Sequence, residues 1–216
     1  MKLSEKLFGN WDIAVRRNLF MPVNRSVPDV AQKRKDWKGL ISGFKASDLV
    51  FLDESGCNTD MTRRYAYSLG GSRAVDSAPL SKPKNTTILP SIQLDGTLHY
   101  TTFSGGTTVE RFKQFLETDL LRYLNGNSVL IMDNMKSHHA KAVKNLLDSS
   151  GVRYIYLPPY SPDLNPIEKL WSKVKAPLRK FKARTLDALP NAIQCAFQAV
   201  SPSDCSDWFK FCDYLH

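Results

Sequence analysis

The chain has 216 residues, 42% of them hydrophobic, which suits one substantial core rather than two full domains. Its formal net charge is +9, and the distribution of this charge along the chain is more informative than the total. No apolar run approaches the roughly 18 residues that a membrane helix needs, and the first thirty residues lack the apolar core of a signal peptide. We therefore expect a soluble, unexported protein with no membrane partner.

The positive charge is concentrated toward the two ends of the chain. Residues 1–47 carry a net +6 and residues 165–216 a net +3, whereas residues 48–164 are neutral. Seven Lys or Arg residues and no acid lie between Lys169 and Arg184. On a helix beside an acidic site such a run indicates a polyanion track, and the alternative is a solvated basic face.

The four cysteines form no Cys-x-x-Cys pair and have no histidine at metal-site spacing. This pattern predicts free thiols in a reducing cytoplasm and argues against a zinc site.

The predicted elements alternate between strands and helices after a basic N-terminal segment. Residues 1–23 are mixed and amphipathic and carry no recognisable chemistry, and residues 27–44 are typical of a basic helix. The dipeptide Asp95-Gly96 between two β-rich runs is a strong hairpin signal. We predict strands over 49–52, 86–94, 97–103, 128–133 and 152–157, and helices over 108–124, 138–147, 166–180, 186–200 and 204–214.

Two of the predicted strands end in an acid. Asp53 follows the apolar run 49–52, and Asp133 ends the run 128–133. Strands joined by helices run parallel, so their carboxyl ends meet at one edge of the sheet, where open α/β sheets bind ligands. Either Asp alone is a common turn former, but both are expected at this edge.

A third acid is expected at the same edge. Asn165 is a suitable helix N-cap, Pro166 suits the first helical position, and Glu168 is three residues after the cap, where its carboxylate could reach back to the Asn165 amide. A capping role is the simple interpretation of Glu168. Together with Asp53 and Asp133, it predicts instead a site of three carboxylates that repel one another unless cations are present.

Oxygen-only ligands favour hard ions such as Mg²⁺ or Mn²⁺. Two such ions about 3.5 to 4 Å apart can clamp the attacking and leaving oxygens of a phosphodiester. The sequence thus predicts Asp53, Asp133 and Glu168 as metal ligands and catalytic residues.

Four motifs occur in an order that resembles the DDE transposases of the mariner superfamily, in their bacterial insertion-sequence branch. They are Val50-Phe-Leu-Asp-Glu-Ser-Gly56, Thr62-Arg-Arg-Tyr65, Leu130-Ile-Met-Asp-Asn134 with His138, and Leu157-Pro-Pro-Tyr-Ser-Pro-Asp-Leu-Asn-Pro-Ile-Glu168 with Trp171. The 34 residues between Asp133 and Glu168 are similar to that family's Asp-Asp-(34)-Glu spacing. The resemblance covers residues 24–180.

The resemblance implies an α/β, ribonuclease H-like fold, with a mixed five-stranded sheet flanked by helices. It implies a metal-dependent DNA endonuclease and strand transferase with two Mg²⁺ or Mn²⁺ ions. Double-stranded DNA, both element ends and target, is the implied substrate, with a homodimer on DNA and nucleoid association in the cytoplasm.

Further residues match motif positions or belong to the basic run. The resemblance places Asn134 and His138 beside the metals, where they would orient ligands or contact phosphate. A polar helix start is the alternative for His138, and Trp171 is expected to be a packing residue. Candidate DNA contacts are Arg63, Arg64, Lys169, Lys173 and Lys175.

Two features depart from the family pattern. Residues 66–69 lack a Gly-Arg-Ala-Pro-like run, and residues 1–23 do not resemble the family's paired helix-turn-helix modules. We therefore expect residues 1–47 to be a basic helical extension, 48–182 the catalytic domain and 183–216 helices that pack on it. A separate DNA-recognition polypeptide would fit a split reading frame. The alternatives are a domesticated DNA-binding relic without chemistry and a ribonuclease H acting on RNA–DNA hybrids.

Overall fold

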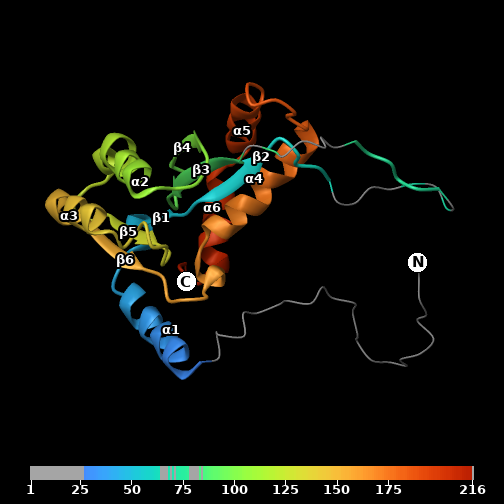
Figure 1. Cartoon of the computed structure of the whole chain (residues 1–216). Helices are drawn as coiled ribbons and strands as arrows, with labels where there is room; N and C mark the ends of the chain where they lie inside the picture. Colours follow the sequence, from blue (N-terminus) through green and yellow to red (C-terminus); the bar gives the residue numbers. More distant parts are fainter. Residues whose placement is uncertain are drawn as a thin grey trace, which may run out of the picture.

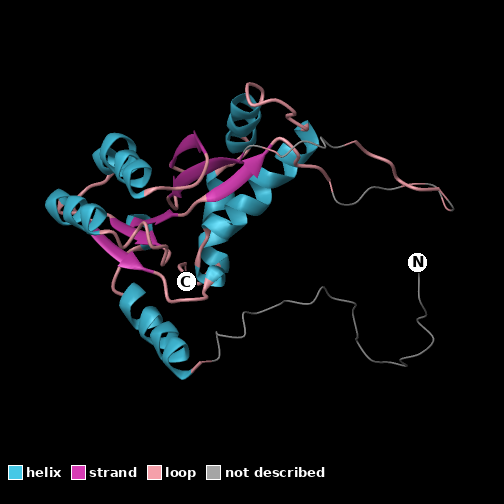
Figure 2. Ribbon diagram, viewed as in Figure 1, coloured by secondary structure: helices cyan, strands magenta, loops and turns pink. Residues whose placement is uncertain are grey.

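The computed structural model describes residues 27–63, 68, 70, 72–77, 83 and 85–215. In this part of the chain a mixed sheet lies between two groups of helices (Figure 1, Figure 2). None of the helices described is both long and apolar enough to cross a membrane. The expectation for residues 1–23 lies outside the described residues.

The sheet is built from strands that run both ways. The strands are β1 (Leu49–Leu52), β2 (Ser55–Asn58), β3 (Asn85–Ile92), β4 (Leu98–Ser104), β5 (Val129–Met132) and β6 (Arg153–Tyr156). Their order is β2-β3-β1-β5-β6, with β4 paired to β3. The strands β1, β5 and β6 are parallel to one another, and β3 is antiparallel to its neighbours.

The segments β1 and β2 act as one interrupted strand. Leu52 pairs with Ser91 and Ser55 with Ile88, so the register on β3 continues unbroken across the gap. The prediction of a mixed, ribonuclease H-like sheet of five strands is therefore confirmed, and Asp53 lies at the interruption.

The two central strands are buried on both faces, as their continuous apolar runs predict. Every residue of β1 and β5 is buried. Alternate residues point to opposite faces, so each strand contributes to two separate cores. Leu49, Phe51, Val129 and Ile131 pack in one core, and Val50, Leu52, Leu130 and Met132 pack in the other.

The helices divide between the two faces. The helices are α1 (Pro28–Ile41), α2 (Val109–Phe115), α3 (Lys141–Ser150), α4 (Ile167–Phe181), α5 (Leu189–Gln198) and α6 (Pro202–Phe211). Buried residues of α4, α5 and α6 share one core with Trp37 of α1, and those of α2 and α3 share the other. Figure 1 shows α2 and α3 on one side of the sheet and α4 to α6 on the other.

Several predicted helices differ from the structure: besides the two described next, 186–200 is found as Leu189–Gln198 and 204–214 as Pro202–Phe211. Thr108 caps α2 as expected, accepting from the Arg111 N–H at 3.3 Å, but the segment 108–124 is not one α-helix. It widens into a π-helical turn, Leu116–Leu120, and ends in a 3₁₀ turn, Leu121–Tyr123. Leu116 and Leu120 are both buried in this segment.

The helix predicted over 138–147 begins later, at Lys141. The residues before it form a turn in which the His138 N–H donates to the Met135 carbonyl oxygen at 3.0 Å. Gly151, with φ of 71°, then ends α3 in the left-handed region that glycine tolerates.

The hairpin between β3 and β4 has the predicted turn. Asp95 accepts from the Thr97 N–H at 2.8 Å, and Gly96 has φ of 90°. A Cβ on Gly96 would lie 2.9 Å from the Cα of Pro202, so glycine also allows α6 to approach the turn.

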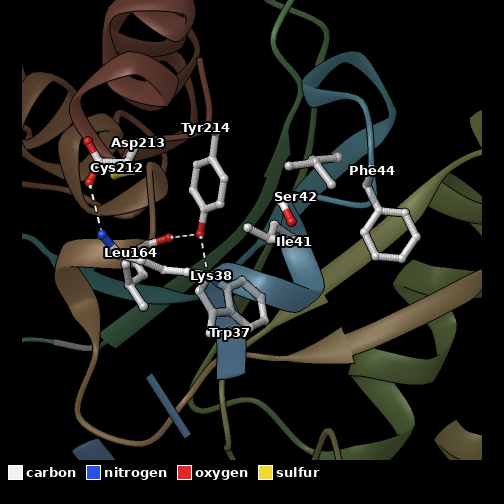
Figure 3. A pocket seen from close by; sticks show the side chains of 10 residues that line it. Trp37, Lys38, Ile41, Ser42, Phe44, Leu164, Cys212, Asp213 and Tyr214 are labelled. Carbon is white, nitrogen blue, oxygen red and sulfur yellow. Dashed lines mark hydrogen bonds and ion pairs between the residues drawn. The ribbon is translucent and has the colours of Figure 1, made fainter. Parts of the chain in front are cut away.

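The helix α1 docks on the chain segment that precedes α4. The Arg34 guanidinium binds the Asp163 carboxylate with two hydrogen bonds, of 2.7 and 3.2 Å. The Trp37 indole donates to the Tyr214 hydroxyl at 3.3 Å, and that hydroxyl donates to the Leu164 carbonyl oxygen at 2.6 Å. A cavity of about 230 Å³ remains between these elements (Figure 3).

Candidate active site

The three predicted acids line one cavity at the carboxyl edge of the parallel strands. Asp53 directly follows β1, Asp133 directly follows β5, and Glu168 is in the first turn of α4. The cavity measures about 450 Å³, and the loop 157–162 forms another of its walls. The parallel-strand argument thus places these carboxylates together, as the sequence predicts.

Asp53 is held by side chains from α4 and the loop before it. Its Oδ2 accepts from the Trp171 indole at 3.3 Å and lies 3.5 Å from Nδ2 of Asn165. Burial raises the pKa of Asp53 from 3.8 to about 7. The Glu54 N–H opposes this shift, and the negative charges of Glu168 and Asp133 add to it.

Asp133 is held by His138, which in turn contacts a fourth acid. Nδ1 of His138 lies 2.8 Å from Oδ1 of Asp133, and Nε2 lies 3.1 Å from Oε2 of Glu54. The ring is fully buried and stacks on Phe112, with 4.2 Å between ring centroids.

The charges of this group follow from its contacts. Burial lowers the pKa of His138, but hydrogen bonds with Asp133 and Glu54 raise it to about 9. Burial raises the pKa of Asp133, yet the hydrogen bonds from His138 and the Met135 N–H hold it below the usual value. A protonated imidazole between two carboxylates is therefore the stable state.

Glu168 does not form the predicted capping box. The Asn165 N–H donates to the Pro162 carbonyl oxygen at 3.1 Å, so it is not available to the Glu168 carboxylate. The Asn165 side chain still accepts from the Ile167 N–H at 3.3 Å, which fits a helix start one residue later than predicted. The Glu168 side chain is exposed to solvent on one side. Partial desolvation by the protein around it raises its pKa, the charge of Lys175 opposes this shift, and repulsion from Asp133 adds to it.

The carboxylates surround the cavity without touching one another. Among the described residues, no three His, Cys, Asp or Glu side chains lie close enough together to hold a metal ion. The donor set of three carboxylates has the chemistry that Mg²⁺ and Mn²⁺ prefer. The side chains would have to draw closer to share an ion, and exposed Glu168 has the freedom to do so.

Of the other predicted residues, Asn134 lies at the site and Arg63 does not. Asn134 lines the cavity, and its amide donates to the Leu157 carbonyl oxygen, tying the ends of β5 and β6 together. Arg63 is exposed, and no contact joins it to the three acids. Arg64 lies outside the described residues.

The basic run of α4 is largely engaged with the protein itself. Lys169 lies over the Phe211 ring at 3.6 Å, Lys173 pairs with Asp204, and Lys175 donates to Ser55. Of these three lysines, Lys175 is the one that interacts electrostatically with Glu168 and Asp53.

Sequence reasoning missed two contacts to the acids. Glu54 is next to Asp53 in the chain, but its link to His138 depends on the packing of β1 against the loop after β5. Trp171 was expected only to pack; it is 5% exposed in the core and also donates to Asp53. Its spacing of three residues from Glu168 could have indicated a shared face of α4.

The fold and the cavity define a ribonuclease H-like domain with three acids at the carboxyl edge of its sheet. Residues 48–190 match the family described as DDE superfamily endonuclease. The chain belongs to this family.

The chain is also similar to transposases of the Tc1 and mariner type. The chain is 29% identical over 97 residues to the transposable element Tc1 transposase of Caenorhabditis elegans, a match that covers 43% of this chain and 36% of Tc1 transposase. The catalytic domain of Mos1 mariner transposase has the same fold, with a TM-score of 0.62 at 17% identity, covering 93% of this chain and 94% of that domain.

A longer Mos1 chain shows how much of a whole transposase this chain spans. The Mos1 transposase paired-end complex with left transposon end matches with a TM-score of 0.73 at 18% identity, covering 94% of this chain and 64% of that one. Mos1 paired-end complexes have been solved with Mg and with Mn. The chain thus spans about a third of Tc1 transposase and under two thirds of that Mos1 chain.

Proposed function

We propose that this chain is the catalytic domain of a transposase that cleaves DNA and joins the freed strand to a target. The observation that carries the proposal is the meeting of Asp53, Asp133 and Glu168 around one cavity, beside a basic helix. The alternative ribonuclease H activity on RNA–DNA hybrids shares the fold but leaves the Pro-Pro-Tyr-Ser-Pro loop without a role.

The three acids would hold two Mg²⁺ or Mn²⁺ ions. Bound there, the ions would supply an activated water and neutralise the charge that develops on the phosphodiester. Trp171 fixes the orientation of Asp53, and His138 fixes that of Asp133 while its charge offsets the local negative charge. Glu168 would close on the site when the DNA and ions are present.

The finer assignments belong to the same proposal. The spacing of 34 residues between Asp133 and Glu168 supports the bacterial insertion-sequence branch. The substrate would be double-stranded DNA, bound by a homodimer in the cytoplasm, with recognition of the element ends by a separate polypeptide. Residues 1–47, 48–182 and 183–216 would be the extension, the catalytic domain and the supporting helices.

Nicking of a labelled duplex in Mg²⁺ or Mn²⁺ tests the proposal. We expect wild-type protein to nick DNA, and Asp133→Asn and Glu168→Gln to lose at least 100-fold in rate, since each removes a metal ligand. Glu117→Gln, an exposed acid on the opposite face of the sheet from α4, is the matched control. Nicking by wild type no faster than by Asp133→Asn would overturn catalysis at this site and favour the DNA-binding relic.

A further inference from the structure

A second cavity lies between β2 and α4, and it is lined by polar and basic groups. It measures about 360 Å³ and shares no lining residue with the cavity of the three acids. Its walls are the segment 56–58 of β2, residues 60–62, and the side chains of Lys175 and Arg179.

The two cations continue a stripe of α4 that starts at the acid site. Lys175 is seven residues after Glu168, and Arg179 is four residues after Lys175, so the three lie on nearly the same side of the helix. At a rise of 1.5 Å per residue, Lys175 is about 10 Å along the axis from Glu168 and Arg179 about 6 Å further.

Lys175 itself donates to Ser55, and most other cations of the basic run also have partners. Lys173 pairs with Asp204, Lys182 pairs with Asp76, and Arg184 donates to three carbonyl oxygens of residues 59, 61 and 77. The Arg179 guanidinium has no ion pair or hydrogen bond with any described residue.

The cavity also lacks an acid that neutralises its charge. Asp60 lines it, but within the described ranges it forms no ion pair with Lys175 or Arg179. The residues between 64 and 84 that the structure does not describe include no Asp or Glu. Burial lowers the pKa of Lys175 and the positive charge of Arg179 lowers it further, against the attraction of Glu168 and Asp53, so a bound anion would relieve the two unfavourable effects.

We propose that this cavity binds a backbone phosphate of the substrate DNA strand through Arg179 and Lys175. An arginine fork and an ammonium group in a half-buried polar cavity suit a phosphate, which offers several acceptor oxygens. The proposal deepens the proposed function.

Salt-dependent DNA binding tests this site without chemistry. Affinity of a fluorescent duplex is measured between 50 and 200 mM salt, with EDTA present and in the Asp133→Asn background. Each lost phosphate contact reduces the slope of log K against log salt concentration by about 0.9. We expect that reduction for Arg179→Gln and for Lys175→Gln, with weaker binding at every salt concentration.

The matched control is Lys180→Gln, since Lys180 is exposed on the same turn but does not line the cavity. We expect Lys180→Gln to change the slope by less than half as much. Arg179→Lys should keep the slope and lose affinity, because it keeps the charge but not the two-pronged contact. Thermal unfolding of each variant checks that the fold is retained.

The outcomes separate this site from the catalytic proposal. If nicking fails but Arg179→Gln shifts the slope and Lys180→Gln does not, the phosphate site stands and only catalysis is wrong. Equal slopes for Arg179→Gln and Lys180→Gln, or no DNA binding by the Asp133→Asn parent, would overturn the phosphate site.

Discussion

The acids of the site are held in three different ways, and this decides what each can do. Asp53 is fixed by Trp171 from α4, and Asp133 is fixed by His138. Glu168 is exposed and free to move. The proposed metal site would therefore have two positioned ligands and one that is free to close.

Glu54 is linked to Asp133 through the His138 ring. One of its oxygens binds His138, and the other is buried without a hydrogen-bond partner among the described residues. Because Glu54 orients His138 and His138 orients Asp133, loss of Glu54 should loosen a metal ligand at a distance.

We predict that Glu54→Leu weakens Mn²⁺ binding about 10-fold or more, in the range found for groups that orient metal ligands. Glu54→Gln should retain most of the affinity, since its amide oxygen can accept from the same ring nitrogen. Isothermal titration with Mn²⁺ measures both, with Glu117→Gln as control. Wild-type affinity in Glu54→Leu would show that the contact does not position Asp133.

The sequence predicts the meeting of Asp53 and Asp133 because parallel strands end at one edge of the sheet, and that of Glu168 because its helix begins after the loop that follows β6. It does not predict the contacts of Glu54 or Trp171. Those contacts depend on side-chain packing between segments more than 80 residues apart in the chain. A local sequence pattern does not indicate which distant side chains will pack together.

At the scale of elements, the capping box occurs at a different helix from the one predicted. Ser201 and Asp204 form it at the start of α6: the Ser201 side chain accepts from the Asp204 N–H, and Asp204 accepts from the Ser201 N–H at 2.8 Å. Asp204 also pairs with Lys173 of α4, so the cap fastens two helices together. The Ser-Pro-Ser-Asp spacing was a usable signal for it.

Lowering the pH should weaken the contacts of Asp204 with Lys173 and Ser201 in a defined pH range. The hydrogen bond from Lys173, with that from Ser201, lowers the pKa of Asp204 to about 2. A carboxyl whose pKa is lower in the folded state stabilises the fold above its unfolded pKa and loses that effect as pH falls through the folded one.

We predict that Asp204→Asn lowers the free energy of unfolding by about 1 kcal/mol at neutral pH. The difference from wild type should shrink between about pH 4 and pH 2, because only the wild-type side chain gains a proton there. Urea unfolding across this pH range measures it. Asp207→Asn on the same helix is the control, and a difference that stays constant with pH would contradict the assignment.

At the scale of the whole molecule, the last described residues of the chain hold the first described helix against the segment that precedes α4. The Tyr214 ring packs on Phe51 of β1, with 5.0 Å between centroids, and its hydroxyl joins Trp37 to Leu164. The sequence predicted the helices at both ends but not this junction, since it joins residues 177 positions apart. The segment that leads to Glu168 is therefore held in place by contacts with residues near both ends of the described chain.

Tyr214→Phe tests these contacts by removing a single oxygen. The Trp37 indole N–H and the Leu164 carbonyl would lose their shared partner in a site where Tyr214 is only 9% exposed. Leaving buried polar groups unpaired costs about 1–3 kcal/mol, so the free energy of unfolding should fall by that amount. Tyr123→Phe, whose ring is 54% exposed, should cost almost nothing. If Tyr214→Phe unfolds at the same denaturant concentration as wild type and Tyr123→Phe, the hydroxyl does not hold these segments together.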